Sequence, residues 1–195
     1  LNVTLPSLRI ESFSIQVMEK LRTSRQGGFT LAPEAASDSM RNRINKPISQ
    51  EMLISTTNSI YQSGWSSIKL YFMIGQPDET LEDVQAIIDL CKAVLQEGRK
   101  LIGKKASLHA GISTFVPKPH TPYQWASLDP LQSVLQKQNM LKDQLRGPGL
   151  KMTWSNPRET ILEAALSRGD RRLGAVIEAA WRRGAKFDAW QDQFN

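Results

Sequence analysis

The sequence predicts an α/β fold, specifically part of a TIM-type (β/α) barrel with a helical appendage at its C-terminal end. Strand-like and helix-like segments alternate at the spacing of β-α-β units, which favours a parallel sheet. The apolar segment 67–74 runs into the loop 75–80, which carries glycine and proline and precedes a helix. The 195 residues, 40% of them hydrophobic, suffice for one core but not for the roughly 250 residues of a complete eight-fold barrel. We expect residues 1–148 to form the barrel portion and residues 149–195 the helical extension.

The expected elements follow in order along the chain. A strand over 3–10 precedes a helix over about 14–23, and a short second strand over 29–32 precedes helical stretches that reach Tyr61. A third strand covers 67–74, a helix 81–97, a fourth strand 107–116 and, after a proline-rich loop, a helix 130–146. Beyond 151–154 the chain is expected to turn helical, because apolar residues recur at helical spacing. These residues are Ile161, Leu162, Ala165, Leu166, Leu173, Val176, Ile177 and Ala180, and we expect them to pack on the barrel.

Three helix starts have recognisable capping chemistry. Thr80 can cap the helix that begins at Leu81. The segments 129–132 (Asp-Pro-Leu-Gln) and 156–159 (Asn-Pro-Arg-Glu) each place a capping residue, a first-turn proline and an acceptor three residues on. Gly169 and Asp170 are expected to end one helix and cap the next.

Composition limits the classes of protein. One cysteine, Cys91, excludes an intrachain disulfide, and nothing resembles a signal peptide or a membrane-spanning run, so we expect a cytoplasmic protein without a membrane partner. A net charge of +6 and a pI near 9.6 would suit nucleic acid or another anionic partner. The densest basic patch is either a solvated helix face or a polyanion contact. It comprises Arg168, Arg171, Arg172, Arg182, Arg183 and Lys186.

In a parallel sheet the carboxyl ends of the strands meet at one edge, where α/β folds bind their ligands. Four polar loops are expected there, at 9–12, 33–37, 75–79 and 115–123. Glu34 would accept hydrogen bonds from a ligand amine or ribose, or else would bond to neighbouring backbone. Arg9 would pair with a ligand carboxylate or phosphate, or else with Glu11 or Glu34.

Other residues have a chemical and a structural interpretation. Lys69, in an apolar strand, would form a Schiff base in a barrel lyase or would simply be paired or reach solvent. His120 lies in a proline-rich loop and would be an acid or base near neutral pH or a positioned loop histidine. His109 is expected to be a strand residue with a structural partner. Cys91 and the two histidines do not have a recognised metal-ligand spacing.

Three motifs together resemble the radical S-adenosylmethionine (SAM) superfamily, whose core is a partial six-stranded barrel. The segment 75–80 (Gly-Gln-Pro-Asp-Glu-Thr) is similar to the Gly-x-Pro-x-Glu-Thr motif after the fifth strand. The segment 32–37 (Ala-Pro-Glu-Ala-Ala-Ser) is similar to a Glu-containing motif after the fourth strand, and 115–122 follows the sixth. The segments 5–12, 68–75 and 168–174 resemble a subgroup of iron–sulfur oxidoreductases that carry a cobalamin-binding-type domain ahead of the barrel.

The resemblance implies a SAM site across the strand ends. It implies that Glu34 contacts the methionyl or ribose part, that the backbone of 73–75 lies near the adenine and that Val116 packs on it. The residues implied to contact SAM are Arg9, Ser12, Glu34, Ser37, Met73, Gly75, Glu79 and Val116. The implied substrate-pocket candidates are Lys118 and His120. In the superfamily a reduced 4Fe-4S cluster gives an electron to SAM, and the resulting radical abstracts a substrate hydrogen. Cobalamin would enter through another domain.

The sequence departs from the family pattern in one respect. The cluster requires three cysteines in a Cys-x3-Cys-x2-Cys loop after the first strand, whereas Cys91 stands alone in a helical stretch. We therefore expect this chain by itself to be inactive. Either it is a fragment whose partner is the upstream half of its own barrel, which we favour, or the domain has lost this chemistry. Its exposed sheet edge would favour self-association. The alternative is an RNA-binding module that uses the basic C-terminal helices and Trp154, Trp181 and Trp190.

Overall fold

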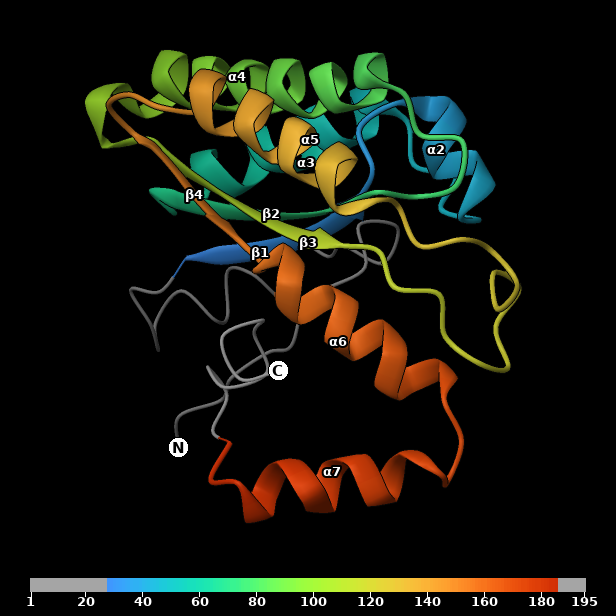
Figure 1. The fold of residues 1–195 in the computed structure, drawn as a ribbon. Helices are drawn as coiled ribbons and strands as arrows, with labels where there is room; N and C mark the ends of the chain where they lie inside the picture. The colour runs from blue at the N-terminus through green and yellow to red at the C-terminus, as the bar shows by residue number, and fades with distance from the viewer. Residues whose placement is uncertain (1–27, 186–195) are drawn as a thin grey trace, which may run out of the picture.

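A computed structural model describes residues 28–185 of the chain. The expected strand 3–10, the expected helix 14–23 and the residues Arg9 and Ser12 lie outside the described residues. Figure 1 shows the arrangement of the elements. They are β1 (Phe29–Glu34), α2 (Asp38–Arg43), α3 (Gln50–Gln62), β2 (Ser67–Ile74), α4 (Leu81–Ile102), the 3-10 turn η2 (Gly103–Lys105), β3 (Ser107–Thr114), α5 (Leu131–Gln144), β4 (Leu150–Trp154), α6 (Pro157–Arg168) and α7 (Leu173–Arg182).

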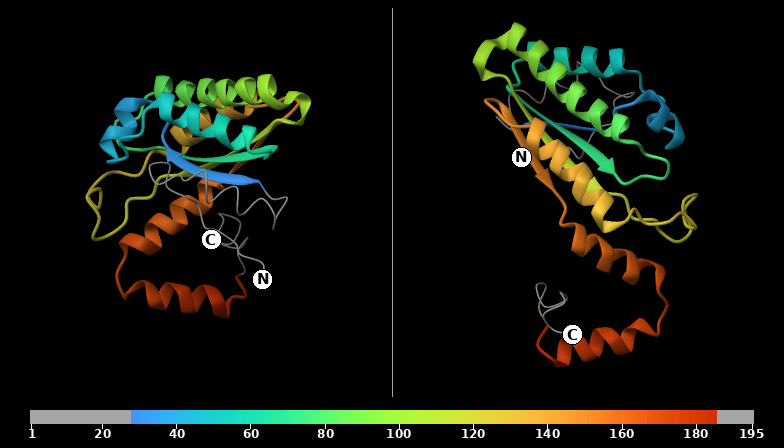
Figure 2. Two further views of the ribbon diagram at one scale, coloured as in Figure 1. Left: turned by 180° about the vertical axis from the view of Figure 1, so that it is seen from behind. Right: turned by 45° about the horizontal axis from the view of Figure 1, so that its top comes forward.

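The four strands form one parallel sheet in the order β1-β2-β3-β4, which confirms the predicted α/β alternation. Figures 1 and 2 show α3, α4 and α5 together on one face of this sheet. Because all four strands are parallel, their carboxyl ends lie at one edge of the sheet, and each connection must cross back to the other edge. The described sheet thus forms a two-layer unit with α3, α4 and α5, whereas α6 and α7 extend away on the other side in Figure 1.

The alternation of side chains along β2 explains the two unlike faces of the sheet. Ile68, Leu70, Phe72 and Ile74 are fully buried beneath the helices, whereas the residues between them point to the other face and are partly exposed. Successive side chains of a strand point to opposite faces, so the helix-covered face collects the apolar set. The core is built mainly from this set and from the inward faces of α3 and α4.

The long helix α4 begins as the sequence predicts. Thr80 is its N-cap, and the side chains of Thr80 and Asp83 form a reciprocal capping box. The helix continues beyond its predicted end at residue 97 to Ile102, whose side chain packs partly buried against the core. Within it, the side chain of Cys91 is fully buried, and burial raises the pKa of its thiol.

Gly98 of α4 lies against the ring of Tyr61 from α3. A Cβ atom at this residue would stand 2.5 Å from Cε2 of Tyr61, inside van der Waals contact. The ring is itself fixed, because Tyr61 is fully buried and its hydroxyl donates to the carbonyl of Ser107 at 3.2 Å. Gly98 therefore allows the close approach of α3 and α4.

We expect Gly98→Ala to destabilise the fold although alanine favours helix. The propensity gain is about 1 kcal/mol, whereas overpacking a filled core costs about 1–3 kcal/mol. Urea unfolding of the variant is expected to show a lower midpoint. Gly174→Ala on α7 is the matched control, because its Cβ meets nothing within 4 Å. Equal stability changes in the two variants would contradict the contact with Tyr61.

One strand was not predicted, and one predicted helix cap is wrong. Residues Leu150–Trp154, to which the sequence analysis assigned no element, form the strand β4, which pairs with β3. The N-cap of α5 is Pro130 without a side-chain hydrogen bond, not Asp129. The Asp129 carboxylate instead accepts hydrogen bonds from Ser133 and Lys137. By contrast, Asn156 caps α6 with Pro157 in its first turn, as predicted.

The C-terminal helices extend from the end of β4, as Figure 1 shows. α6 buries Thr160 and Ala164, whereas α7 has no buried residue. The expected packing of α7 on the barrel is therefore not seen within residues 28–185. Gly169 ends α6 as predicted, but the N-cap of α7 is Arg172 rather than Asp170. No helix in this range is both long and apolar enough to cross a lipid bilayer.

Candidate ligand site at the carboxyl edge of the sheet

The end of β1 departs from regular strand geometry where the first candidate residue lies. Leu31 pairs with Leu70, but the next paired residue is Glu34 with Phe72, so one extra residue of β1 bulges out of the ladder. Glu34 has φ 65°, which is uncommon for a residue other than glycine. Bulges next to ligand sites re-aim a side chain, and this one sets the direction of the Glu34 carboxylate.

Lys46 and Arg41 hold this irregular strand end in place. The Lys46 ammonium donates to the carbonyl of Ala32 at 2.8 Å and lies 3.0 Å from Oε1 of Glu34. The Arg41 side chain is almost fully buried and donates to the carbonyl of Ala36 at 2.6 Å. Oε2 of Glu34 has no partner within the described residues, and a quarter of the side chain is exposed. Glu34 is thus a fixed carboxylate with a free oxygen.

The neighbouring strand β2 also ends in a left-handed residue. Gly75 has φ 78°, and a Cβ at this residue would stand 3.1 Å from Cβ of Asp129. Its N–H donates to the Glu79 carboxylate at 2.6 Å, which closes the loop into a tight turn. Glycine is therefore needed here both for its conformation and for its size.

A buried charge cluster, formed by Lys137, Glu79 and Asp129, supports the loop that begins at Gly75. The Lys137 ammonium lies 2.8 Å from Glu79 and 2.9 Å from Asp129, and the Lys137 and Glu79 side chains are 6% and 3% exposed. Burial alone would lower the pKa of Lys137, but its hydrogen bonds to Glu79 and Asp129 outweigh burial and raise that pKa. The ammonium therefore stays charged. A pocket of about 220 Å³ opens above this cluster, lined by residues 75–79, 127–130, Ser133 and Lys137.

The structure brings together several of the sequence-predicted site residues. Glu34, Met73, Gly75 and Val116 lie at or just beyond the carboxyl ends of β1, β2 and β3. The carbonyl of Met73 accepts from the Gln76 side chain and that of Ile74 from the N–H of Phe115. The backbone implied to lie near adenine thus already makes internal hydrogen bonds.

The remaining predicted site residues have structural partners or are solvent-exposed. Glu79 is occupied by Gly75 and Lys137. Ser37 caps α2 and donates to Asp83 at 2.6 Å. Lys118 forms an ion pair with Glu163 of α6 and donates to Ser167. His120 is exposed with φ 61°.

Sequence reasoning missed Arg41, Lys46, Lys137 and Asp129 as supports of the site. A signal existed for Lys137, because it falls on the same helical face as Val134 and Leu141, which are buried. A lysine on the apolar face of a helix requires a buried carboxylate partner. No comparable local signal marks Lys46, which lies in the turn between α2 and α3 and contacts Ala32 and Glu34 of β1, more than ten residues earlier in the sequence.

His109 and Lys69 both lie on the face of the sheet that points away from α3, α4 and α5. Nε2 of His109 lies 2.9 Å from Oγ1 of Thr153 on β4, which confirms a structural partner for this histidine. The Lys69 ammonium lies 4.5 Å from the centroid of the Tyr71 ring. Within residues 28–185, no three His, Cys, Asp or Glu side chains are grouped as a metal site.

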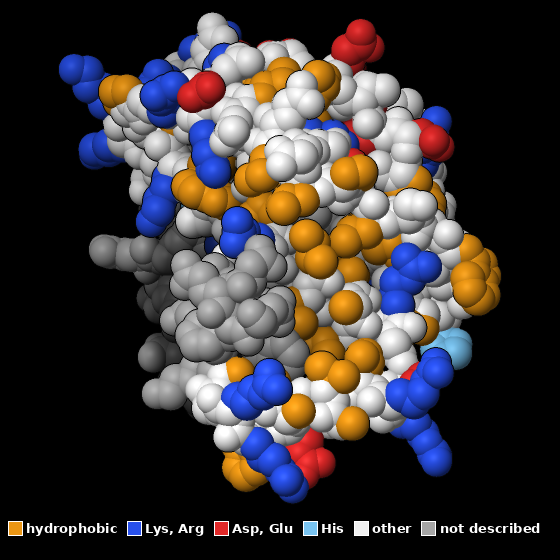
Figure 3. Space-filling view, in the orientation of Figure 1, with side chains coloured by type: hydrophobic (Ala, Val, Ile, Leu, Met, Phe, Trp, Pro, Cys, Tyr) orange, Lys and Arg blue, Asp and Glu red, His pale blue; other side chains and the backbone are white. Residues whose placement is uncertain are grey.

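The basic C-terminal patch is exposed in the part that the structure describes. Figure 3 shows basic side chains dispersed over the region where Figure 1 places α7, together with acidic ones. Arg172 forms an ion pair with Asp170, and Arg182 with Glu178. Trp181 is 74% exposed. Lys186 and Trp190 lie outside the described residues.

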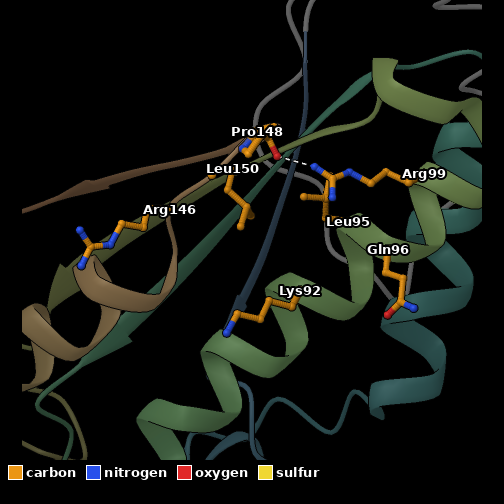
Figure 4. Close-up of a pocket in the computed structure, with 8 residues that line it drawn as sticks. Lys92, Leu95, Gln96, Arg99, Arg146, Pro148 and Leu150 are labelled. Atoms are coloured by element: carbon orange, nitrogen blue, oxygen red, sulfur yellow. Dashed lines mark hydrogen bonds between the residues drawn. The ribbon is translucent and has the colours of Figure 1, made fainter.

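A second hollow lies at the opposite edge of the sheet, before β4. Its volume is about 320 Å³, and Figure 4 shows Leu95 and Leu150 at its centre, with Lys92 and Arg99 on α4 beside them. Arg99 donates to the carbonyl of Pro148, which ties α4 to the turn that precedes β4. This hollow is remote from Glu34 and Gly75 and contains none of the predicted site residues.

Comparison with known proteins gives one distant similarity. No protein-family model matches the chain. The chain is 29% identical over 177 residues to a protein of Methanocaldococcus jannaschii named Uncharacterized protein MJ0966. The matched region covers 91% of this chain, and the chain spans 37% of the length of that protein. The similarity therefore extends over nearly the whole sequence, but the name of that protein assigns no activity.

Proposed function

We propose that this chain is the SAM-binding part of a radical SAM enzyme, in which an upstream segment supplies the 4Fe-4S cluster and completes the barrel. The observation that carries the proposal is the pair of left-handed residues, Glu34 and Gly75, at the carboxyl ends of adjacent parallel strands. Ligands of α/β folds bind at this edge. The motif resemblance at 32–37 and 75–80 falls on these same two strand ends.

The chemistry of the donors at this edge fits SAM in part. Glu34 offers a fixed carboxylate with one free oxygen, which suits the ammonium of a methionyl group or a ribose hydroxyl. Val116 supplies a largely buried apolar side chain just beyond the end of β3, with β2 between it and Glu34. Oε2 of Glu79 accepts from the N–H of Gly75 and pairs with the Lys137 ammonium, and Ser37 donates to Asp83, so these two residues would act by holding the loops in shape. We therefore assign direct contact to Glu34 and Val116 and positioning to Glu79 and Ser37.

When bound together, a reduced cluster and SAM would supply one-electron cleavage of SAM and abstraction of a hydrogen atom from the substrate. The residues of this chain would bind, orient and exclude water. Lys46 holds the Glu34 carboxylate, and the Lys137 cluster fixes the Gly75 loop. Such fixed groups lower the reorganisation required when a ligand reacts.

The test is anaerobic and uses the complete polypeptide that carries this chain. After reconstitution with iron and sulfide, we expect SAM and dithionite to yield 5′-deoxyadenosine, and the product to disappear when the cluster cysteines are replaced. A cluster-loaded protein that yields no 5′-deoxyadenosine would overturn the proposal. Cluster loading is verified by its absorption spectrum, so that failed reconstitution is not mistaken for absence of activity.

A further inference from the structure

The face of the sheet that α3, α4 and α5 leave uncovered carries a row of basic side chains. Lys69 of β2 is in register with His109 of β3, and His109 is in register with Lys151 of β4. Neighbouring strands lie about 4.8 Å apart, so the row is about 10 Å long. All three side chains are partly or largely exposed, whereas their strand neighbours Ile68 and Leu108 are buried on the opposite face.

The row lacks acidic counterparts. Among the described residues, neither Lys69 nor Lys151 forms an ion pair, and His109 bonds to a neutral hydroxyl. The pKa of His109 is lowered, first by burial and then by the charges of Lys69 and Lys151. Like charges on neighbouring strands oppose folding. A row of basic side chains without acidic partners is suited to bind an anion, because the anion would relieve the repulsion between them.

The surroundings of the row direct its groups toward one another. A Cβ at Gly111 would stand 2.8 Å from the Tyr71 ring and 3.4 Å from Cε of Lys69, so both side chains of β2 lean over β3 at this residue. Thr153 adds a hydroxyl beside His109. The absence of a side chain at 111 therefore gathers the ammonium, the imidazole and the hydroxyl over one strand.

We propose that Lys69, His109 and Lys151 bind a phosphate group of the substrate on this face of the sheet. Phosphate is favoured over carboxylate because it carries up to two negative charges and three acceptor oxygens, which match two ammonium groups and an imidazole better than a single carboxylate charge does. That the phosphate belongs to a substrate rests on the function proposed above; the anion site itself does not. From Lys69 to Met73 the strand rises about 13 Å, which leaves room for the reacting part near Glu34.

The experiment uses the 195-residue chain and inorganic pyrophosphate, with no SAM present. The chain has two histidines, so their ring protons can be followed separately by NMR. We expect pyrophosphate to shift the His109 signal saturably and to raise its apparent pKa, while His120 is unaffected. Lys69→Gln with Lys151→Gln is expected to weaken binding about tenfold or more, from the loss of two charge-assisted contacts.

The control removes the same amount of charge elsewhere. Lys92→Gln with Lys100→Gln alters two exposed lysines of α4 and is expected to leave pyrophosphate binding unchanged. An equal loss in both double variants, or no saturable shift of His109, would overturn the site. Succinate that binds as tightly as pyrophosphate would overturn the assignment to phosphate. Because SAM takes no part, failure here is distinct from failure to form 5′-deoxyadenosine.

Discussion

Lys137→Ala is expected to cost about 3–5 kcal/mol of folding free energy, the range for breaking a buried ion pair by removing one partner. Glu79 and Asp129 would be left facing each other without a cation, and the Glu79 carboxylate is 3% exposed. Because Glu79 also accepts from the N–H of Gly75, the loop at the end of β2 would lose its support as well. Urea unfolding monitored by circular dichroism measures the change.

Lys100→Ala is the matched control for this prediction. Its ammonium pairs with Glu97 across one turn of α4, but the Lys100 side chain is 61% exposed. An exposed pair of this kind contributes about 0–1 kcal/mol. A similar small loss in both variants would mean that the Lys137 cluster does not stabilise the fold. A triple variant, Glu79→Gln, Asp129→Asn and Lys137→Met, is expected to recover much of the loss because it leaves no buried charge.

Glu34→Ala is expected to weaken SAM binding roughly 10- to 150-fold, which corresponds to one charge-assisted hydrogen bond of about 1.5–3 kcal/mol. Alanine keeps the Cβ atom and hence the same left-handed backbone cost at φ 65°, so folding should change little. Isothermal titration calorimetry of the chain with SAM gives the affinity. Circular dichroism confirms that the variant is folded.

Two further variants separate contact from positioning at this residue. Lys46→Gln keeps the carboxylate but removes its clamp, and we expect a smaller loss of affinity than from Glu34→Ala. Glu82→Ala removes an exposed carboxylate of α4 and should have no effect on the affinity. Unchanged SAM affinity in Glu34→Ala would contradict the assignment of Glu34 as a contact residue.

The elements predicted best are those whose signals are local. The strand at 67–74 and the starts of α4 and α6 follow from an apolar run and from the caps Thr80 and Asn156. β4 was missed because it is short, and because Lys151 and Thr153 point to the uncovered face and interrupt any apolar run. Its pairing with β3 is long-range and leaves no trace in neighbouring residues.

In the candidate site, too, features with local sequence signals could be predicted, and features that depend on long-range contacts could not. Gly75 could be assigned to a tight turn from its neighbours, since glycine and proline two residues apart, between an apolar strand and a helix start, indicate a turn. Asp129 had the sequence of a cap, but a buried ammonium eight residues later competes for its carboxylate and forms the stronger interaction. The left-handed Glu34 depends on the bulge in β1 and on Lys46, neither of which a local pattern encodes.

Because Cys91 is buried, the rate at which its thiol is chemically modified depends on how often the fold opens. Thiolates, not thiols, react with alkylating agents and oxidants, and this side chain is both inaccessible and held protonated. Reagents can reach it only when α4 separates from the sheet and from α3. The rate at which an alkylating agent modifies Cys91 therefore measures how often the helical layer opens.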